Sequence, residues 1–186
     1  AAAAEEEPPP RAPVKLRLDV AKAMEVERGP TERELRADKL QRFEGECTRI
    51  EDYLFVGGHK AATSREVLAA SGITHVVNCA ASTSENAFEG ELQYMSLHID
   101  DSAEEDIVAH VYRAADFIEA ARRRPGGGRV LVHCTQGVSR SCSVCMTYLM
   151  LDQGLTCDQA FKRVKACRGV CNPNPGFMSQ LLDWER

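Results

Sequence analysis

Short apolar runs alternate with longer segments of helical periodicity along most of this chain. The clearest runs are "DYLFVGG", "ITHVVNCA", "LQYMSLHI" and "RVLVHC", and helical segments such as "IVAHVYRAADFIEAARRR" and "SVCMTYLMLDQG" lie between or after them. Strands that alternate with helices usually pair in parallel, and such a sheet needs helices on both faces. The alternation therefore predicts an α/β fold with a central, mostly parallel sheet flanked by helices on both faces.

Capping signals indicate where the helices begin and end. We expect a helix over "SREVLAAS" closed by Gly72, one over "TCDQAFKRVKACRG" with Thr156 as N-cap, and a last one over "NPGFMSQLLDWE". Pro175 lies near the first turn of that last helix, a position that proline favours. A Thr-x-x-Glu pattern opens "TERELRADKLQRF" and predicts a short helix from about residue 31 to 43.

Length and composition fit one globular domain with an N-terminal tail. The 186 residues, 44% of them hydrophobic, are enough for one well-packed core. The opening "AAAAEEEPPPRAPVK" has almost nothing to bury. We therefore expect residues 1–44 to form a tail with a short helix and residues 45–186 to form the domain. A chain that lacks an initiator Met and stops at "LLDWER" is expected to be part of a longer protein.

Composition also bounds the partners. The chain has no apolar run of membrane-spanning length and no secretion signal, so we expect a cytoplasmic or nuclear protein. Its eight cysteines are then expected to be free thiols. The pairs Cys142/Cys145 and Cys167/Cys171 lack the turn-rich flanks of a zinc knuckle, and we expect neither metal nor cofactor. A net charge of −5 argues against general binding to nucleic acid or membranes, so an anionic ligand must be captured locally.

The segment "VLVHCTQGVSRS" predicts such a local site, because it joins a buried strand to a helix at the carboxyl end of the sheet. Its loop can point backbone N–H groups inward over the helix N-terminus. Gly137 permits this curl, and Arg140 supplies a planar fork for two phosphate oxygens. These groups favour the thiolate of Cys134, which can attack phosphorus. The predicted phosphate-binding residues are Thr135, Gln136, Gly137, Val138, Ser139 and Arg140.

The side chains next to Cys134 each have two possible roles. Ser141 either donates a hydrogen bond to the sulfur of Cys134 and helps it leave, or simply caps the helix. His133 either braces the loop or is a satisfied core histidine. Cys79 and Cys142 could trap an oxidised Cys134 in a disulfide, the alternative being inert buried thiols.

A proton donor for the leaving oxygen must stand opposite the thiolate. The only suitable segment is "HIDDSAEEDI", although acidic residues before a helix also serve as caps. Composition alone leaves Asp100, Asp101 and Asp106 open.

"VHCTQGVSRS" resembles the H-C-x-x-G-x-x-R-S signature of cysteine-dependent protein phosphatases of the dual-specificity subfamily. The likeness covers roughly residues 47 to 186 and includes "YLFVGG", "GITHVVNC", "AADFI" and "NPNPGF". Within it, "GITHVVNCA", "CTQGVSRS", "TYLM" and "ACRGVCNPNPGF" look most like the MAP-kinase phosphatases of plants and green algae. It implies a protein-tyrosine-phosphatase-like fold and a phosphocysteine intermediate on Cys134. It also implies a general acid six residues before Ile107, which selects Asp101 and keeps Asp100 in reserve.

The resemblance implies a phosphoprotein substrate, dephosphorylated on phosphotyrosine and on phosphoserine or phosphothreonine. Phosphoinositide phosphatases generally place lysines in the loop, whereas this chain has Thr135, Gln136 and Val138 there. A MAP kinase is the expected partner; the alternatives are a non-kinase substrate and a phosphoprotein-binding pseudophosphatase. "RAPVKLRLD", with Leu16 and Leu18, has the outline of a MAP-kinase docking peptide. Nothing in the sequence predicts the oligomeric state.

Overall fold

The computed structural model describes residues 29–186, and its contacts divide the chain between Thr31 and Glu32. The predicted docking peptide lies outside the described residues. The helices are α2 (Glu32–Glu44), α3 (His59–Ala62), α4 (Arg65–Ser71), η1 (Val108–His110), α5 (Val111–Arg122), α6 (Arg140–Gln153), α7 (Cys157–Cys167) and α8 (Pro175–Trp184). The strands are β1 (Thr48–Arg49), β2 (Leu54–Gly57), β3 (His75–Asn78), β4 (Gln93–Ser96) and β5 (Val130–His133).

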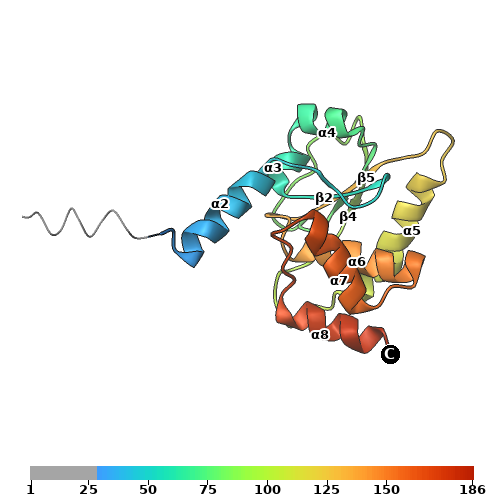
Figure 1. Cartoon of the computed structure of the whole chain (residues 1–186). Coiled ribbons are helices and arrows are strands. Elements are labelled where there is room, and N and C mark those ends of the chain that lie inside the picture. Colours follow the sequence, from blue (N-terminus) through green and yellow to red (C-terminus); the bar gives the residue numbers. More distant parts are fainter. Residues whose placement is uncertain (1–28) are drawn as a thin grey trace, which may run out of the picture. The chain divides into compact units, whose positions relative to one another are not determined.

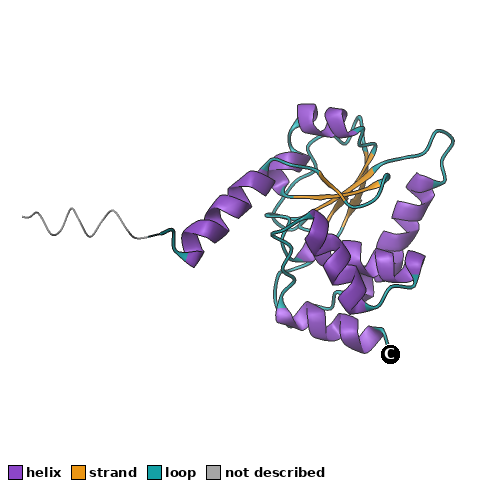
Figure 2. Ribbon diagram, viewed as in Figure 1, coloured by secondary structure: helices purple, strands orange, loops and turns teal. Residues whose placement is uncertain are grey.

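The five strands form one sheet in the order β1-β2-β5-β3-β4. Only the pairing of β1 with β2 is antiparallel, and the other three are parallel. The predicted α/β fold with a mostly parallel sheet is confirmed (Figure 2). Neither β1 nor α3 was predicted, because two and four residues are too short to show a period.

Alternate strand positions face two apolar cores, which explains the near-continuous apolar runs. Two adjacent cross-strand rows are Phe55–Leu131–Val76 and Val56–Val132–Val77. The first row packs with side chains of α3 and α4, and the second belongs to the larger core built with α5, α6, α7 and α8. Figure 1 shows these two groups of helices on opposite sides of the sheet. Helices on both faces are therefore confirmed.

The helix ends follow the expected caps. Gly72 is left-handed, with φ of 64°, at the end of α4. Thr156 caps α7 in a reciprocal capping box with Gln159. Pro175 is the first residue of α8. One expected helix differs: the segment after Asp106 starts as the 3₁₀ turn η1 before α5 begins, a frequent form of helix N-terminus.

The four parallel strands β2, β3, β4 and β5 direct their carboxyl ends to the same edge of the sheet, and β5 continues there into the Cys134–Arg140 loop and α6. Ten successive residues of α6, from Ser141 to Met150, are buried, so the loop is anchored at both ends by the core. Within residues 29–186, no helix is long and apolar enough to cross a bilayer.

Candidate active site

The Cys134–Arg140 loop encloses the floor of a cavity of about 540 Å³. The Sγ atom of Cys134 accepts the backbone N–H of Gly137 at 3.2 Å and lies 3.3 Å from Oγ of Ser141. One backbone N–H and one hydroxyl therefore contact the sulfur. The predicted phosphate-binding residues that line the cavity are Thr135, Gln136, Val138, Ser139 and Arg140.

Gly137 lies in the tightest part of the loop. Its φ is 69°, the left-handed conformation expected from the sequence. A Cβ atom at this position would stand 2.4 Å from the carbonyl oxygen of Gly57, on the neighbouring strand β2. Only glycine therefore allows the loop to curl this close to the sheet.

Arg140 begins α6 and folds back over the loop. Its Nη1 donates to the carbonyl oxygen of Ile99 at 3.1 Å, and its Nη2 donates to Oγ1 of Thr135 at 3.0 Å. The Nε atom is buried and, among residues 29–186, finds no hydrogen-bond acceptor; it lies 3.7 Å from Oδ2 of Asp101. Leaving a buried donor unsatisfied costs about 1–3 kcal/mol, so this guanidinium suits an oxyanion in the cavity.

Asp101 is the acidic residue that lines the cavity. Its Oδ1 accepts hydrogen bonds from Oγ of Ser139 at 2.6 Å and from Nδ2 of Asn174 at 2.9 Å. The side chain remains 37% exposed, so the carboxylate is held in place while keeping access to solvent.

The two other candidate acids have different surroundings. Asp100 lies outside the cavity lining, and its backbone N–H donates to Oε2 of Glu105 at 3.2 Å. Asp106 accepts the N–H of Ala109, a residue of the turn η1, at 3.1 Å through Oδ1. Of the three aspartates, only Asp101 shares the cavity with Cys134 and Arg140.

His133 and Ser141 flank the loop in the core. Burial lowers the pKa of His133 to about 4, so its ring is neutral near pH 7. Its Nδ1 lies 3.3 Å from the carbonyl oxygen of Cys134 and must carry the proton, because a carbonyl only accepts. This contact braces the loop. Ser139, not Ser141, occupies the N-cap position of α6, which leaves the Ser141 hydroxyl facing the sulfur.

Arg168 supports the loop from behind, and sequence reasoning missed it. The side chain is fully buried, and its Nε donates to the carbonyl oxygen of Gly137 at 2.6 Å. Its Nη2 donates to the carbonyl oxygen of Gln136 at 3.3 Å, and its Nη1 to Oγ1 of Thr48 at 2.9 Å. These bonds fix the Gln136 and Gly137 carbonyls, and the N–H of Gly137 donates to Sγ of Cys134. An arginine at the end of a predicted amphipathic helix usually contacts solvent, so no separate signal marks this one in the sequence.

Helix α8 holds the acidic loop, and this too was missed. Gln180 exchanges hydrogen bonds with the backbone of this loop, accepting from Ile107 N–H at 3.0 Å and donating to Glu105 carbonyl oxygen at 2.8 Å. Gly176 allows a close approach, because a Cβ there would meet the carbonyl oxygen of Ala103 at 2.2 Å. In the sequence, "NPNPGF" served as part of the resemblance and as the start of a helix, and the contact of Gly176 with the loop that carries Asp101 was not foreseen.

The other cysteines belong to the core. All eight cysteines are free, and Cys142 and Cys145 are buried in α6. The hydrogen bond with Cys171, followed by burial, raises the pKa of Cys142, and burial raises that of Cys79. Raised pKa values make these thiols weak nucleophiles. Among residues 29–186, no three His, Cys, Asp or Glu side chains are grouped as ligands of a metal ion.

A family model describes this combination of fold and loop. Residues 54–186 match the model of the dual specificity phosphatase catalytic domain. The chain belongs to the dual-specificity phosphatase family. Protein-tyrosine-phosphatase MKP1 of Arabidopsis thaliana is 36% identical over 172 residues, which cover 92% of this chain and 22% of that protein. Human dual specificity protein phosphatase 1 is 39% identical over 142 residues, 76% of this chain and 38% of that protein. The chain thus spans less than half the length of these relatives.

Solved structures of the family share the fold. Human DUSP28 matches with a TM-score of 0.68 and 37% identity, covering 75% of this chain and 92% of that one. The human tyrosine phosphatase-like serine/threonine/tyrosine-interacting protein matches with a TM-score of 0.70 and 32% identity, covering 76% of this chain and 97% of that one. The expected protein-tyrosine-phosphatase-like fold of the dual-specificity subfamily is therefore confirmed.

Proposed function

We propose that this domain hydrolyses phosphotyrosine and phosphoserine or phosphothreonine in proteins through a phosphocysteine intermediate. Cys134 is the nucleophile, Arg140 and the loop N–H groups bind the phosphate, and Asp101 is the general acid. The observation that carries the proposal is a single cavity lined by the Cys134 thiol, by an arginine whose buried Nε donor has no hydrogen-bond acceptor among residues 29–186, and by a carboxylate 3.7 Å from that donor.

In the first step the Cys134 thiolate attacks phosphorus, and the bond from phosphorus to the substrate oxygen breaks. Asp101 gives its proton to that oxygen, which leaves as a neutral hydroxyl. The three equatorial oxygens bind to Arg140 and the loop N–H groups, which stabilise the negative charge as it shifts.

In the second step water attacks the phosphocysteine and the sulfur leaves as thiolate. Asp101, now ionised, takes a proton from the water. Ser141, whose Oγ lies 3.3 Å from Sγ, donates a hydrogen bond that stabilises the departing thiolate. His133 stays neutral and holds the Cys134 carbonyl, so it positions the loop and transfers no proton.

A phosphorylated protein, and a MAP kinase in particular, is the substrate we propose. Similarity to protein-tyrosine-phosphatase MKP1 supports a protein substrate, and so does the absence of lysine from the Cys134–Arg140 loop. A non-kinase phosphoprotein is the alternative.

A phosphoprotein-binding role without turnover is the second candidate. It is favoured by the likeness to a human tyrosine phosphatase-like interacting protein. The presence of Cys134, Arg140 and Asp101 in one cavity favours turnover instead.

Trapping separates these roles and identifies the substrate. Wild-type protein is expected to release phosphate from a doubly phosphorylated kinase peptide and from p-nitrophenyl phosphate, whereas Cys134→Ser is expected to release none. Cys134→Ser and Asp101→Ala proteins should retain phosphoproteins from a lysate, in a complex that vanadate disrupts. If these variants retain phosphoproteins but the wild-type protein releases no phosphate, the enzymatic proposal fails and a phosphoprotein-binding role is supported.

A further inference from the structure

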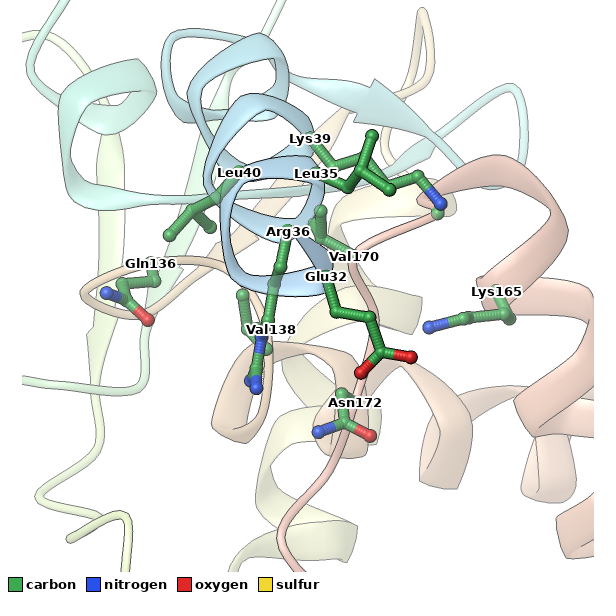
Figure 3. Close-up of a pocket in the computed structure, with 11 residues that line it drawn as sticks. Glu32, Leu35, Arg36, Lys39, Leu40, Gln136, Val138, Lys165, Val170 and Asn172 are labelled. Atoms are coloured by element: carbon green, nitrogen blue, oxygen red, sulfur yellow. The ribbon is translucent and has the colours of Figure 1, made fainter. Parts of the chain in front are cut away.

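A second cavity, of about 410 Å³, opens beside the catalytic one (Figure 3). Helix α2 forms one wall, and the Cys134–Arg140 loop and the segment after α7 form the others. The two cavities are adjacent, and four residues line both. These shared residues are Arg36, Gln136, Val138 and Asn172. We call this second cavity the flank groove.

The flank groove is rich in positive charge although the chain has a net charge of −5. Arg36, Lys39 and Lys165 line it, against one acidic residue, Glu32. Figure 3 shows Arg36 extending from α2 toward Val138, whereas Glu32 extends toward Asn172 and Lys165. Neither Arg36 nor Lys39 forms a salt bridge with any residue in the range 29–186.

Apolar side chains line the same groove. Leu35 and Leu40 of α2 stand across from Val138 and Val170. Leu35 is 47% exposed, and α2 as a whole buries no residue. The apolar surface of this helix thus contributes little to the domain core, although a ligand in the groove would cover it.

Contacts near its C-terminus hold α2 in place. The Phe43 carbonyl accepts from Nη2 of Arg168 at 3.2 Å, and the Arg168 guanidinium lies 5.2 Å from the Phe43 ring centroid. Glu44 forms a 3.2 Å salt bridge with Lys60 of α3. Because Arg168 also holds the Cys134–Arg140 loop, the same side chain ties the wall of the groove to the catalytic floor.

We propose that the flank groove binds the polypeptide segment next to the phosphorylated residue of the substrate, and that it selects an acidic segment carrying one large apolar side chain. This inference rests on the proposed function, because the groove is adjacent to the cavity of Cys134. Carboxylates of the segment pair with Arg36, Lys39 and Lys165, and the apolar side chain packs between Leu35 and the loop. The negative charge of Glu32 repels acidic segments and reduces the preference of the groove for them.

Binding to Cys134→Ser protein, measured by fluorescence anisotropy, tests the inference. Three phosphotyrosine peptides of equal length carry one leucine each and differ only in flanking Glu, Gln or Lys residues. We expect the Glu peptide to bind about tenfold more tightly than the Gln peptide, as two or three ion pairs at a partly buried site would give. High salt should reduce this ratio.

Two matched pairs of charge reversals on α2 test whether the preference for the Glu peptide depends on residues that line the groove. Arg36→Glu/Lys39→Glu in the Cys134→Ser background should abolish or invert the preference for Glu over Gln. Arg33→Glu/Arg42→Glu changes the same helix by the same charge at exposed positions outside the groove, and the preference should persist. Glu32→Gln should strengthen it. Replacing the peptide leucine by serine should weaken binding of the Glu peptide.

The outcomes separate the inference from the proposed function. Equal binding of the Glu and Gln peptides, or equal effects of the two double reversals, overturns the inference even if the wild-type protein hydrolyses both peptides. A Glu preference that depends on Arg36 and Lys39, in a protein that hydrolyses no substrate, supports the groove while the enzymatic function fails.

Discussion

At the scale of single residues, Arg168 is the side chain whose removal should be most informative. Arg168→Met would leave the loop carbonyls and the Thr48 hydroxyl without their buried donor. We expect the free energy of unfolding in urea to fall by about 2–3 kcal/mol, because unsatisfied buried polar groups cost that much. Phosphate binding should weaken with it, since the loop N–H groups lose their orientation.

A conservative variant distinguishes positioning from general stability. Arg168→Lys keeps one charged donor and should recover part of the affinity for inorganic phosphate, measured as inhibition of p-nitrophenyl phosphate hydrolysis. If Arg168→Met lowers stability but leaves phosphate inhibition unchanged, the loop does not depend on this side chain.

His133 should make stability depend on pH. Burial holds its folded pKa at about 4, below the unfolded value near 6.5, so the unfolded state binds the proton first as pH falls. The free energy of unfolding should therefore decline from about pH 6.5 to about pH 4, by up to ~3 kcal/mol, and show no contribution from this residue above pH 7. His75, whose pKa burial also lowers, acts in the same direction.

Urea titrations of the wild type and His133→Gln between pH 4.5 and 7.5 isolate the effect. The variant should show a shallower decline over the acidic half of this window. Parallel curves for the two proteins would contradict a buried neutral imidazole at position 133.

At the scale of elements, α8 should control the acid rather than the nucleophile. Gly176→Ala would bring a Cβ against the carbonyl oxygen of Ala103 and displace the loop that carries Asp101. We expect kcat/KM to fall about 10²-fold for phosphothreonine peptides, whose alkoxide leaving group needs a proton. The loss should shrink for aryl phosphates with more acidic leaving groups.

Gly90→Ala is the control for this substitution, because a Cβ there meets no atom within 4 Å. It should leave all substrates unaffected. A loss from Gly176→Ala that is the same for every leaving group would place its effect on the nucleophile or on folding.

The main elements could be predicted because each has a local signal. The runs that became β2, β3 and β5 are buried throughout, β4 lies in a run with alternating apolar positions, and Gly72, Thr156 and Pro175 mark helix ends with specific backbone requirements. Short elements such as β1 have no period to detect, and they form because a neighbouring strand offers hydrogen bonds.

At the scale of the whole molecule, the Cys134–Arg140 loop could be predicted and its supports could not. The proposed nucleophile Cys134, Gly137 and Arg140 lie within seven residues, so a local pattern can indicate the chemistry. Arg168 bonds to Gly137, 31 residues earlier in the sequence, and Asn174 bonds to Asp101, 73 residues earlier. No local sequence pattern indicates contacts between residues so far apart. Asp101 was chosen by family resemblance, and the structure adds a geometric reason: its carboxylate shares the cavity with Cys134.

The flank groove also belongs to this scale, because it forms where α2, the Cys134–Arg140 loop and the segment after α7 meet. The sequence predicted a short helix in the tail without a role for it. In the structure that helix lies in the same compact unit as the rest of Glu32–Arg186 and lines a cavity with the Cys134–Arg140 loop. Substrate selection would then depend on residues that precede the stretch matched by the family model, which begins at residue 54.

Mass spectrometry of acid-quenched turnover tests the central claim most directly. Wild-type protein mixed with a phosphotyrosine peptide and quenched within milliseconds should carry one phosphate on the proteolytic fragment that contains Cys134. The Cys134→Ser protein should carry none, and Asp101→Ala should form the adduct more slowly from substrates with poor leaving groups. Peptide dephosphorylation without a phosphate on Cys134, or with the phosphate on another residue, would contradict the mechanism.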